Sequence, residues 1–278
     1  GLKTTLSMCR HLLTVIMPQC DHPQVISQRD SLLDWKTFEP EAIPTKTKLP
    51  YLDAFLQAVK RDFSQEKPPS IIDLGCGTGE ITERILKCGF SMVGMDLNPQ
   101  AISRARRSFE SSASTAGARI RFCEGNIAIF PPPGLAEAPF CAAMCQLVIS
   151  IIGDRDNRQN LLRNAYELLR PNGLLYLSAS GVSADINPEY ARLYEADFAL
   201  TGERFTYLSR SVDGGILYTT HHFTEEELRT LLLSAGFVDI RIRKLKEKSS
   251  RRSDQSAYFY YCLCRKPPES SVHHQQFE

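Results

Sequence analysis

The chain lacks a long apolar run, and its charges almost cancel. The apolar segment Leu12–Met17 is far shorter than the ~20 residues that a membrane-spanning helix needs, and no small-residue cleavage site of a secretory signal is evident near it. The 33 basic residues against 32 acidic ones create no bias toward nucleic acids or other polyanions. We therefore expect a globular protein with no membrane partner and no nucleic-acid partner.

The sequence also lacks the cysteine spacing of a metal site or a disulfide framework. None of its nine cysteines form a Cys-x-x-Cys pair, and an odd number cannot pair completely. Cys262 and Cys264 lie two residues apart on a predicted strand and share one face, which is typical of small core residues. We expect no metal site, reduced thiols and a cytoplasmic location.

The most informative feature that is present is a glycine-rich stretch. In Ile71–Gly79, two β-branched residues lead into Asp73 and then into glycines at alternate positions, which predicts a strand that ends in a ligand-contacting turn. A dinucleotide site would have the spacing Gly-x-Gly-x-x-Gly, with a helix N-terminus facing a pyrophosphate. Here the third glycine comes one residue early, and the carboxylate of Glu80 would repel a phosphate. The loop therefore indicates a cofactor without phosphate groups.

The order acid, x, Gly, x, Gly, x, Gly resembles the first motif of the class I S-adenosylmethionine (SAM)-dependent methyltransferases. Asp96, at the end of a second predicted strand over 91–95, can accept two hydrogen bonds from a ribose diol. Asn126 follows a third strand over 120–123, where the family usually has an acid that accepts from the adenine amino group; an amide oxygen can also accept there. The resemblance is to small-molecule enzymes of the ubiquinone and menaquinone biosynthesis type.

Two later segments fit the same family. Residues 147–152 are predicted as a buried fourth strand whose end lies under the cofactor, and 168–173 as a helix end that turns into a fifth strand over 174–177. The resemblance implies SAM as cofactor and S-adenosylhomocysteine as product. The implied cofactor-binding residues are Asp73, Gly75, Cys76, Gly77, Asp96, Leu97, Asn126, Ile127, Ser150 and Ile151.

The predicted fold class is α/β, a doubly wound, Rossmann-like, seven-stranded sheet. It is mostly parallel, and the resemblance implies that 238–242 and 257–264 form an antiparallel pair at its edge. Three parts are expected: an N-terminal helical lid over 1–66 with a helix at 51–63, the methyltransferase domain over 67–266, and a flexible tail over 267–278. Thr224 and Glu227 form a capping box that marks the start of the last helix.

A substrate cover is expected in the insertion 179–223. Asp213–Gly215 predicts a hairpin turn between strands at 207–212 and 216–220. The insertion is rich in aromatic residues, which suit a planar or cationic small molecule. The substrate candidates are Tyr190, Tyr194, Tyr207, Tyr218 and Trp35. Alternatively, Tyr190, Tyr194 and Phe198 form only the buried face of a helix, and Trp35 only packs its segment onto the core.

His221 and His222 are the candidates for a catalytic base, because histidine exchanges protons near neutral pH. Adjacent strand residues point to opposite faces, so only one of them can enter a shared site, and the nearby helix N-terminus disfavours a charged ring. The acids of Gly153–Asn157 suggest either a Mg²⁺ site or a helix cap, and capping is the better explanation.

The predicted function is transfer of a methyl group to an oxygen or nitrogen atom of a small molecule by in-line displacement, driven mainly by positioning. One alternative is a protein or nucleic-acid methyltransferase; against the latter, Ser150–Gly153 lacks the Asn/Asp-Pro-Pro-aromatic loop that grips a flipped base. A second alternative is a SAM-fold protein that keeps the pocket as a non-catalytic structural or regulatory module, or that uses it to hold a substrate for a different reaction. The substrate and the oligomeric state stay open.

Overall fold

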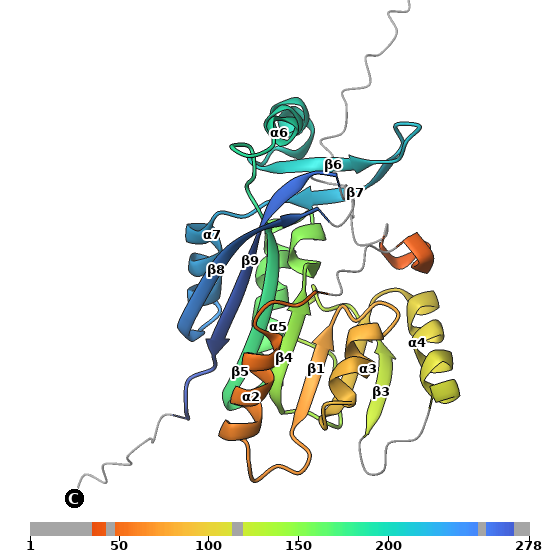
Figure 1. Cartoon of the computed structure of the whole chain (residues 1–278), viewed down its shortest axis with the longest axis vertical. Helices are drawn as coiled ribbons and strands as arrows, with labels where there is room; N and C mark the ends of the chain where they lie inside the picture. Colours follow the sequence, from red (N-terminus) through yellow and green to blue (C-terminus); the bar gives the residue numbers. More distant parts are fainter. Residues whose placement is uncertain (1–34, 43–47, 113–118, 250–253, 270–278) are drawn as a thin grey trace, which may run out of the picture.

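A computed structural model describes residues 35–42, 48–112, 119–249 and 254–269. It contains a seven-stranded sheet flanked by helices, with a helix and a two-stranded sheet above one end (Figure 1). In chain order the elements are η2 Pro40–Ala42, α2 Leu52–Asp62, β1 Ser70–Leu74, α3 Glu80–Leu86, β2 Ser91–Asp96, α4 Pro99–Ser112, β3 Ile120–Glu124, β4 Phe140–Gln146, η3 Val148–Ile151, α5 Arg155–Leu168, β5 Leu169–Gly181, α6 Pro188–Thr201, β6 Thr206–Arg210, β7 Ile216–His221, α7 Glu225–Ser234, β8 Val238–Lys248 and β9 Ser256–Arg265.

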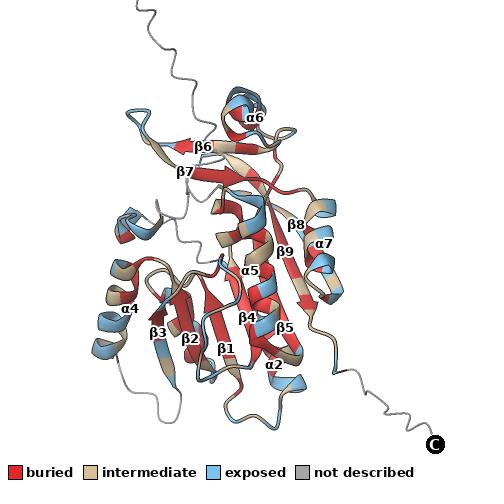
Figure 2. Ribbon diagram, turned by 180° about the vertical axis from the view of Figure 1, so that it is seen from behind, coloured by how far each residue is buried: buried red, intermediate tan, exposed pale blue. Residues whose placement is uncertain are grey.

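The large sheet has the order β3-β2-β1-β4-β5-β9-β8. Neighbouring strands from β3 to β5 are parallel, whereas β9 is antiparallel to both β5 and β8. The central strands β1 and β4 are buried on both faces, as their almost continuous apolar sequences require (Figure 2). The predicted seven-stranded, mostly parallel sheet with an antiparallel edge pair is therefore confirmed.

Helices cover both faces of the sheet. The core on one side contains apolar residues of α2 and α3, and the core on the other side contains residues of α5 and α7. Cys262 and Cys264 of β9 both belong to the second core. Within the described residues, no helix combines the length and the apolar character that crossing a bilayer demands.

The predicted fourth strand is wrong. Strand β4 ends at Gln146, and residues 148–151 form the short 3-10 helix η3. Leu147 has a left-handed φ of 60°, which ends the extended conformation. Short apolar runs do not distinguish a strand from a buried helical turn, and the strand uses the Cys, Ala and Met side chains of 141–145 instead. Strand β5 is also much longer than the predicted 174–177.

Several local predictions are confirmed by side-chain caps. Thr224 Oγ1 accepts a hydrogen bond from the Glu227 amide at 3.2 Å and begins α7. Asp154 accepts from the Asn157 amide at 2.9 Å and begins α5, so this acid is a helix cap as expected. Helix α2 lies at the predicted place. The remainder of the predicted lid before residue 35, and the tail beyond residue 269, fall outside the described residues, and the predicted domain limits stay predictions.

The cover consists of α6 and the hairpin of β6 and β7, above the carboxyl ends of the parallel strands (Figure 1). The hairpin is present as predicted, with Leu208 opposite Thr219 and Ser209 opposite Tyr218. Tyr190 and Tyr194 of α6 are buried, but Phe198 of the same helix is 49% exposed. The three aromatic residues spaced by four therefore do not share one buried face.

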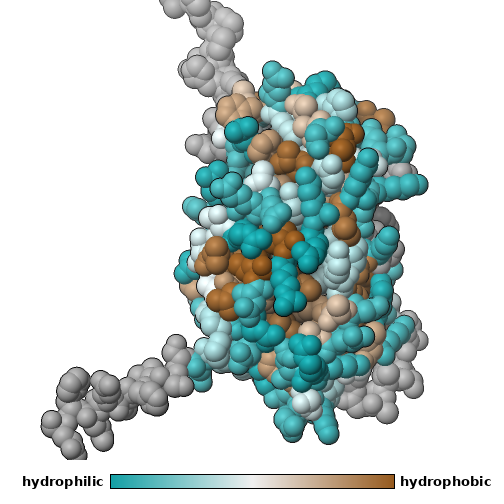
Figure 3. Space-filling model, turned by 60° about the vertical axis from the view of Figure 1, so that its left-hand side comes forward, coloured by the Kyte–Doolittle hydropathy of each residue, from teal (hydrophilic) through white to brown (hydrophobic). Residues whose placement is uncertain are grey.

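The side that carries α7 and β8 shows apolar side chains gathered among polar ones (Figure 3). Of the exposed large apolar residues, Leu233 belongs to α7 and Val238 to β8. Strand β8 is the edge of the sheet and carries alternating basic residues toward its end. Such charges are the usual protection of an exposed edge against pairing with another chain.

Candidate functional site

A cavity of about 840 Å³ lies between the carboxyl ends of the parallel strands and the cover. All ten residues predicted to bind the cofactor line it, and so do four of the five substrate candidates and one of the two histidines. The lining residues among the predicted set are Asp73, Gly75, Cys76, Gly77, Asp96, Leu97, Asn126, Ile127, Ser150, Ile151, Trp35, Tyr190, Tyr207, Tyr218 and His222. Tyr194 and His221 are not part of its wall. The structure thus brings residues from 35 to 222 together at one site.

The three glycines of the loop at 75–79 have different reasons to be glycine. All three have positive φ. A Cβ on Gly75 would lie 2.3 Å from a methyl group of Val148 in η3, so a tertiary neighbour excludes a side chain there. A Cβ on Gly77, which lines the cavity, would meet nothing within 4 Å. Gly77 is therefore the glycine that keeps the ligand side of the loop open.

Asp96 ends β2 at the rim of the cavity. Its Oδ2 accepts from the Gly77 amide at 2.8 Å and its Oδ1 from the Asn98 amide at 2.9 Å. Burial raises the pKa of this carboxyl, and those two backbone bonds oppose the rise. Each carboxylate oxygen has further acceptor capacity, so a ligand diol can still be bound. Asp96 therefore both holds the glycine loop in place and presents an acceptor to the cavity.

Asp73 lies deeper, at the end of β1, and is almost completely buried. It accepts a hydrogen bond from the Thr82 hydroxyl at 2.7 Å. Burial raises the pKa of Asp73 to about 7; the Thr82 bond opposes this rise, and the neighbouring charge of Asp96 adds to it. A cation in the cavity would stabilise the charged form, so this site favours a positively charged ligand near Asp73.

Helix α3 begins at Glu80, directly after the loop, with acids Glu80 and Glu83 in its first turn. Glu80 lines the cavity. A helix N-terminus that binds phosphate leaves its amides facing the anion, whereas here a carboxylate occupies that place. The loop therefore has the electrostatics expected for a cofactor without phosphate groups.

Asn126 and Ser150 line the cavity and are also engaged in the fold. The Asn126 side-chain oxygen accepts from the Ala128 amide at 2.9 Å and retains a second lone pair for a ligand amino group. Ser150 Oγ accepts from the Ser180 amide at 2.8 Å, which fastens η3 to β5. Ser150 is thus at the site although it lies in a helical turn, not at a strand end.

Several lining residues were not predicted, and most of them come from η3 and the cover. They are Thr78, Glu80, Ile81, Asn98, Ala128, Gln146, Leu147, Val148, Ile152, Ser180, Glu189, Arg192, Leu193, Leu208, Ser209, Arg210, Ser211, Val212, Leu217, Thr220, Ser249, Ala257 and Phe259. Asn98 had a sequence signal, because Asn followed by Pro predicts a helix cap. It does accept from the Gln100 and Ala101 amides at the start of α4.

Asn98 also joins the N-terminal segment to the site. Its side-chain amide donates to the carbonyl oxygens of Trp35 at 3.0 Å and Phe38 at 2.7 Å. The Trp35 ring lies 4.8 Å from the ring of Phe38 and 4.6 Å from that of Tyr218 in β7. Residues 35–38 therefore reach from α4 to the cover hairpin, and Trp35 packs there and lines the cavity at once.

His222 lies in an aromatic, uncharged part of the cavity wall. Its Nδ1 is 2.5 Å from the Tyr194 hydroxyl, its Nε2 is 3.4 Å from the Tyr207 hydroxyl, and the ring of Tyr190 packs edge-on at 4.8 Å. Burial lowers the pKa of His222 to about 3, and the adjacent His221 lowers it further in the same direction. The ring is therefore neutral at physiological pH.

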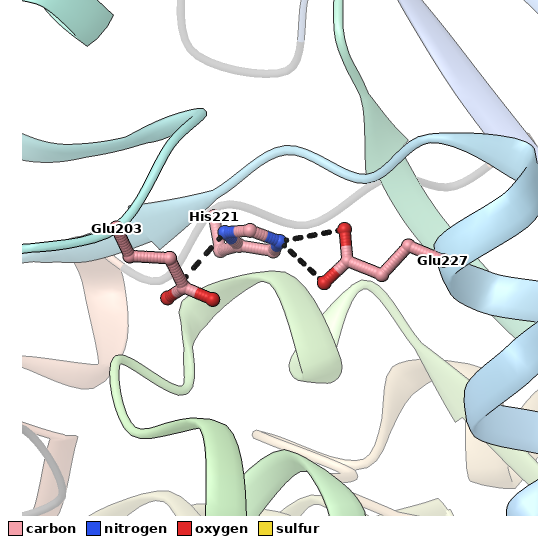
Figure 4. A group of neighbouring side chains, drawn as sticks. All are labelled: Glu203, His221 and Glu227. Atoms are coloured by element: carbon pink, nitrogen blue, oxygen red, sulfur yellow. Dashed lines mark hydrogen bonds and ion pairs between the residues drawn. The ribbon is translucent and has the colours of Figure 1, made fainter.

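His221 points the other way, into a group of charged side chains (Figure 4). Its Nε2 is 3.0 Å from Glu227 Oε1, and its Nδ1 is 2.6 Å from the Thr206 hydroxyl and 3.8 Å from Glu203 Oε2. The two carboxylates therefore face different edges of one imidazole ring. The fully buried Arg158 bonds Glu203 Oε1 at 2.5 Å, so a metal ion there would have to compete with a guanidinium. This group fastens the hairpin to α5 and α7.

Comparison with known proteins agrees with this geometry. Residues 71–173 match the family model described as a methyltransferase domain. The chain is 30% identical over 112 residues to an arsenite methyltransferase of Aquipseudomonas alcaligenes, and 26% identical over 155 residues to a ubiquinone biosynthesis O-methyltransferase of Xanthomonas campestris pv. campestris. These alignments cover 39% and 56% of the chain, and 32% and 55% of the relatives, so the chain spans a third to about half of their length.

Among solved structures, the chain resembles a SAM-dependent methyltransferase from Methanosarcina mazei, with a TM-score of 0.69 and 24% identity. That match covers 80% of this chain and 99% of the other, and it shows a shared fold. The sheet order, the glycine loop after β1 and the acid that ends β2 all agree with the family match. The family match over 71–173, the methyltransferase relatives and the shared fold support a class I SAM-dependent methyltransferase, for which S-adenosylmethionine is the cofactor.

Proposed function

We propose that this chain binds SAM at the carboxyl ends of β1, β2 and β4 and transfers its methyl group to an oxygen or nitrogen atom of a small molecule beneath the cover. The observation that carries the proposal is the single cavity shared by the ten predicted cofactor residues and the aromatic cover. Its volume of about 840 Å³ lies toward the upper end of the ~300–1,000 Å³ usual for ligand sites. It therefore has room for a cofactor and a second small molecule.

The residues around the loop fit the cofactor in chemical terms. Asp96 offers carboxylate oxygens to the ribose diol, Asn126 an amide oxygen to the adenine amino group, and Asp73 a counter-charge for the ammonium group of the amino acid part. When bound, SAM supplies a methyl group on a sulfonium, which is a good leaving group. The protein's task is then to align the acceptor atom, exclude water and hold the cofactor still.

The cover favours a planar, uncharged substrate. Tyr190, Tyr207 and His222 contribute rings to one wall, and His222 is neutral. Two cationic side chains of the cover have partners: Arg210 makes a bidentate ion pair with Asp197 at 2.7 and 2.8 Å, and Arg192 pairs with Glu189. Arg210 therefore has its charge compensated within the cover, and ring stacking and hydrogen bonds would select the substrate.

The test is to incubate the full chain with SAM that carries an isotopic label in its methyl group, together with pooled phenols, amines, carboxylic acids and thiols. Mass spectrometry would follow both S-adenosylhomocysteine and the labelled product. A labelled phenol or amine is the expected result. Tight SAM binding with no transfer to any pool would favour the non-catalytic alternative, and absence of SAM binding would overturn the cofactor assignment.

The matched control is Asp154→Ala, because Asp154 caps α5 and does not line the cavity. Transfer should persist in this variant and fall in Asp96→Ala.

For the location we propose the cytoplasm, because the seven cysteines within the described residues are free thiols, which suits a reducing compartment.

A further inference from the structure

We propose that His222 serves the site as a hydrogen-bond donor through Nε2, in a tautomer set by Tyr194, and that it holds an oxygen atom of the substrate. In this role His222 touches the substrate, and Tyr194 is a positioning residue behind it. The tautomer is independent of the proposed methyl transfer; only the identity of the bound oxygen rests on that function.

The hydrogen bond between Tyr194 and His222 has a defined direction. Tyr194 Oη lies 2.5 Å from Nδ1, and both side chains are buried. Burial raises the pKa of this phenol, so its oxygen keeps its proton at neutral pH. A buried phenol proton needs an acceptor, and Nδ1 of His222 lies at hydrogen-bond distance, so the phenol donates and Nδ1 accepts.

The direction of this bond fixes the protonation of the ring. An Nδ1 that accepts a hydrogen bond carries no proton, so the proton of a neutral imidazole lies on Nε2. The groups that face the ring are the phenols of Tyr190, Tyr194 and Tyr207, and His221 is its neighbour in the chain. None of these is a carboxylate, so no anion among them stabilises a charged ring. His222 therefore remains a neutral donor.

The position of Nε2 follows from the residues that line the cavity. His222 and Tyr207 line the cavity, whereas Tyr194 does not. Nδ1 of His222 therefore faces Tyr194, which lies behind the cavity wall. Nε2 faces Tyr207, which is part of that wall. The separation of 3.4 Å from Nε2 to the Tyr207 hydroxyl is long for a hydrogen bond. A ligand oxygen at ordinary distance would compete for this proton.

His222 therefore has a different role from the catalytic base that the sequence suggests. A ring whose Nδ1 is engaged and whose Nε2 carries the proton cannot accept a proton from the substrate without losing the Tyr194 bond. It can instead donate to a carbonyl or phenolic oxygen next to the methylated atom. The corresponding substrates are planar rings that carry such an oxygen.

The tautomer can be tested directly by NMR on the full chain with ¹⁵N-labelled histidine, with the His222 signals assigned from His222→Gln. We expect a proton on Nε2, none on Nδ1, and no titration of this ring between pH 5.5 and 8.5. Tyr194→Phe should populate the Nδ1-protonated form. Tyr190→Phe, which keeps the ring contact, should leave the tautomer unchanged. A wild-type ring protonated on Nδ1, or charged at pH 7, would overturn the proposal.

The oxygen contact can be tested by calorimetry with two probes of similar shape, chromone and naphthalene, in the presence of S-adenosylhomocysteine. Chromone should bind the wild-type chain about tenfold more tightly. His222→Phe should abolish this preference, and His222→Gln, whose amide can donate from a similar place, should restore part of it. Equal affinities in the wild-type chain, or no binding of either probe, would contradict the oxygen contact. Neither experiment requires turnover, so absence of methyl transfer would not affect them.

Discussion

The two halves of the cavity are built in different ways. On the cofactor side, backbone groups fix the acidic side chain: Asp96 accepts from the amides of Gly77 and Asn98, close to it on adjoining loops. On the cover side, side chains from separate elements fix one another, as Tyr194 does with His222 and Arg158 with Glu203. A site made from strand ends and their turns is thus encoded locally, whereas the cover depends on contacts across the fold.

The adjacent residues His221 and His222 show the same contrast within one strand end. His221 belongs to a network of charged groups that holds the cover in place, and His222 belongs to an uncharged wall of the cavity. Substitutions that affect only one half of the cavity would test whether the stability of the cover and the binding of the cofactor are independent.

The largest effect is expected from Arg158→Met. It removes a fully buried guanidinium and leaves Glu203, only 13% exposed, without its main partner. The free energy of unfolding should fall by about 3–5 kcal/mol, as is usual when one member of a buried ion pair is lost. Urea denaturation measures this. SAM affinity of the folded protein should change less than twofold, because Arg158 does not line the cavity.

The matched control for Arg158 is Arg155→Met, because Arg155 pairs with the same carboxylate but is 74% exposed. Its loss should cost less than about 1 kcal/mol. Equal losses for the two variants would show that burial does not set the strength of this network.

The next effect concerns the glycine loop, where Gly75→Ala and Gly77→Ala should separate stability from binding. Gly75→Ala adds a Cβ that clashes with Val148 at a φ of +80°, so unfolding should become easier by about 2–4 kcal/mol. Gly77→Ala has open space and should cost only about 1–2 kcal/mol of stability for its positive φ. The added methyl group of Gly77→Ala should nevertheless weaken SAM binding more than Gly75→Ala does. Calorimetry would measure both affinities. The reverse pattern would exclude Gly77 as the ligand-facing glycine.

Asp96→Ala should weaken SAM binding by about 1–3 kcal/mol, which is roughly 5- to 150-fold in the dissociation constant. The cause is loss of the ribose acceptor and of the support for the Gly77 amide. Asp154→Ala, the cap of α5, should lower stability by about 1 kcal/mol and leave SAM affinity unchanged. An unaltered affinity in Asp96→Ala would remove this residue from the cofactor site.

The last prediction is a pH dependence from Asp73, and its effect on SAM affinity is expected to be the smallest of the binding effects. Its pKa is about 7 in the folded chain and near the ordinary 3.8 when unfolded, so between these values the folded state binds more protons. This term therefore lowers stability as pH rises through the window. Bound SAM is cationic and favours the carboxylate, so its affinity should rise severalfold between pH 6 and 8. In Asp73→Asn both dependences should be weaker; if they persist unchanged, another group causes them.

Much of the cofactor half could be predicted from sequence because short-range rules determine it. Alternating glycines, a carboxylate at a strand end and an Asn-Pro cap each have one main structural meaning. The apolar run 147–152 fits a strand and a buried helical turn equally well, so its sequence does not decide between them. Its left-handed Leu147 and its packing on Gly75 are consequences of neighbours from other strands.

The side-chain contacts of the cover could not be predicted from the sequence. The sequence by itself determined the α/β class, the glycine loop, the strand-end acids and the hairpin, because these follow from periodicity and from the backbone demands of single residues. Strand alternation also required that His221 and His222 face opposite sides. Only the tertiary structure decided which one enters the cavity, since Tyr194, Tyr207, Glu203 and Glu227 reach them from other parts of the chain, and burial among uncharged rings or beside charges depends on that packing.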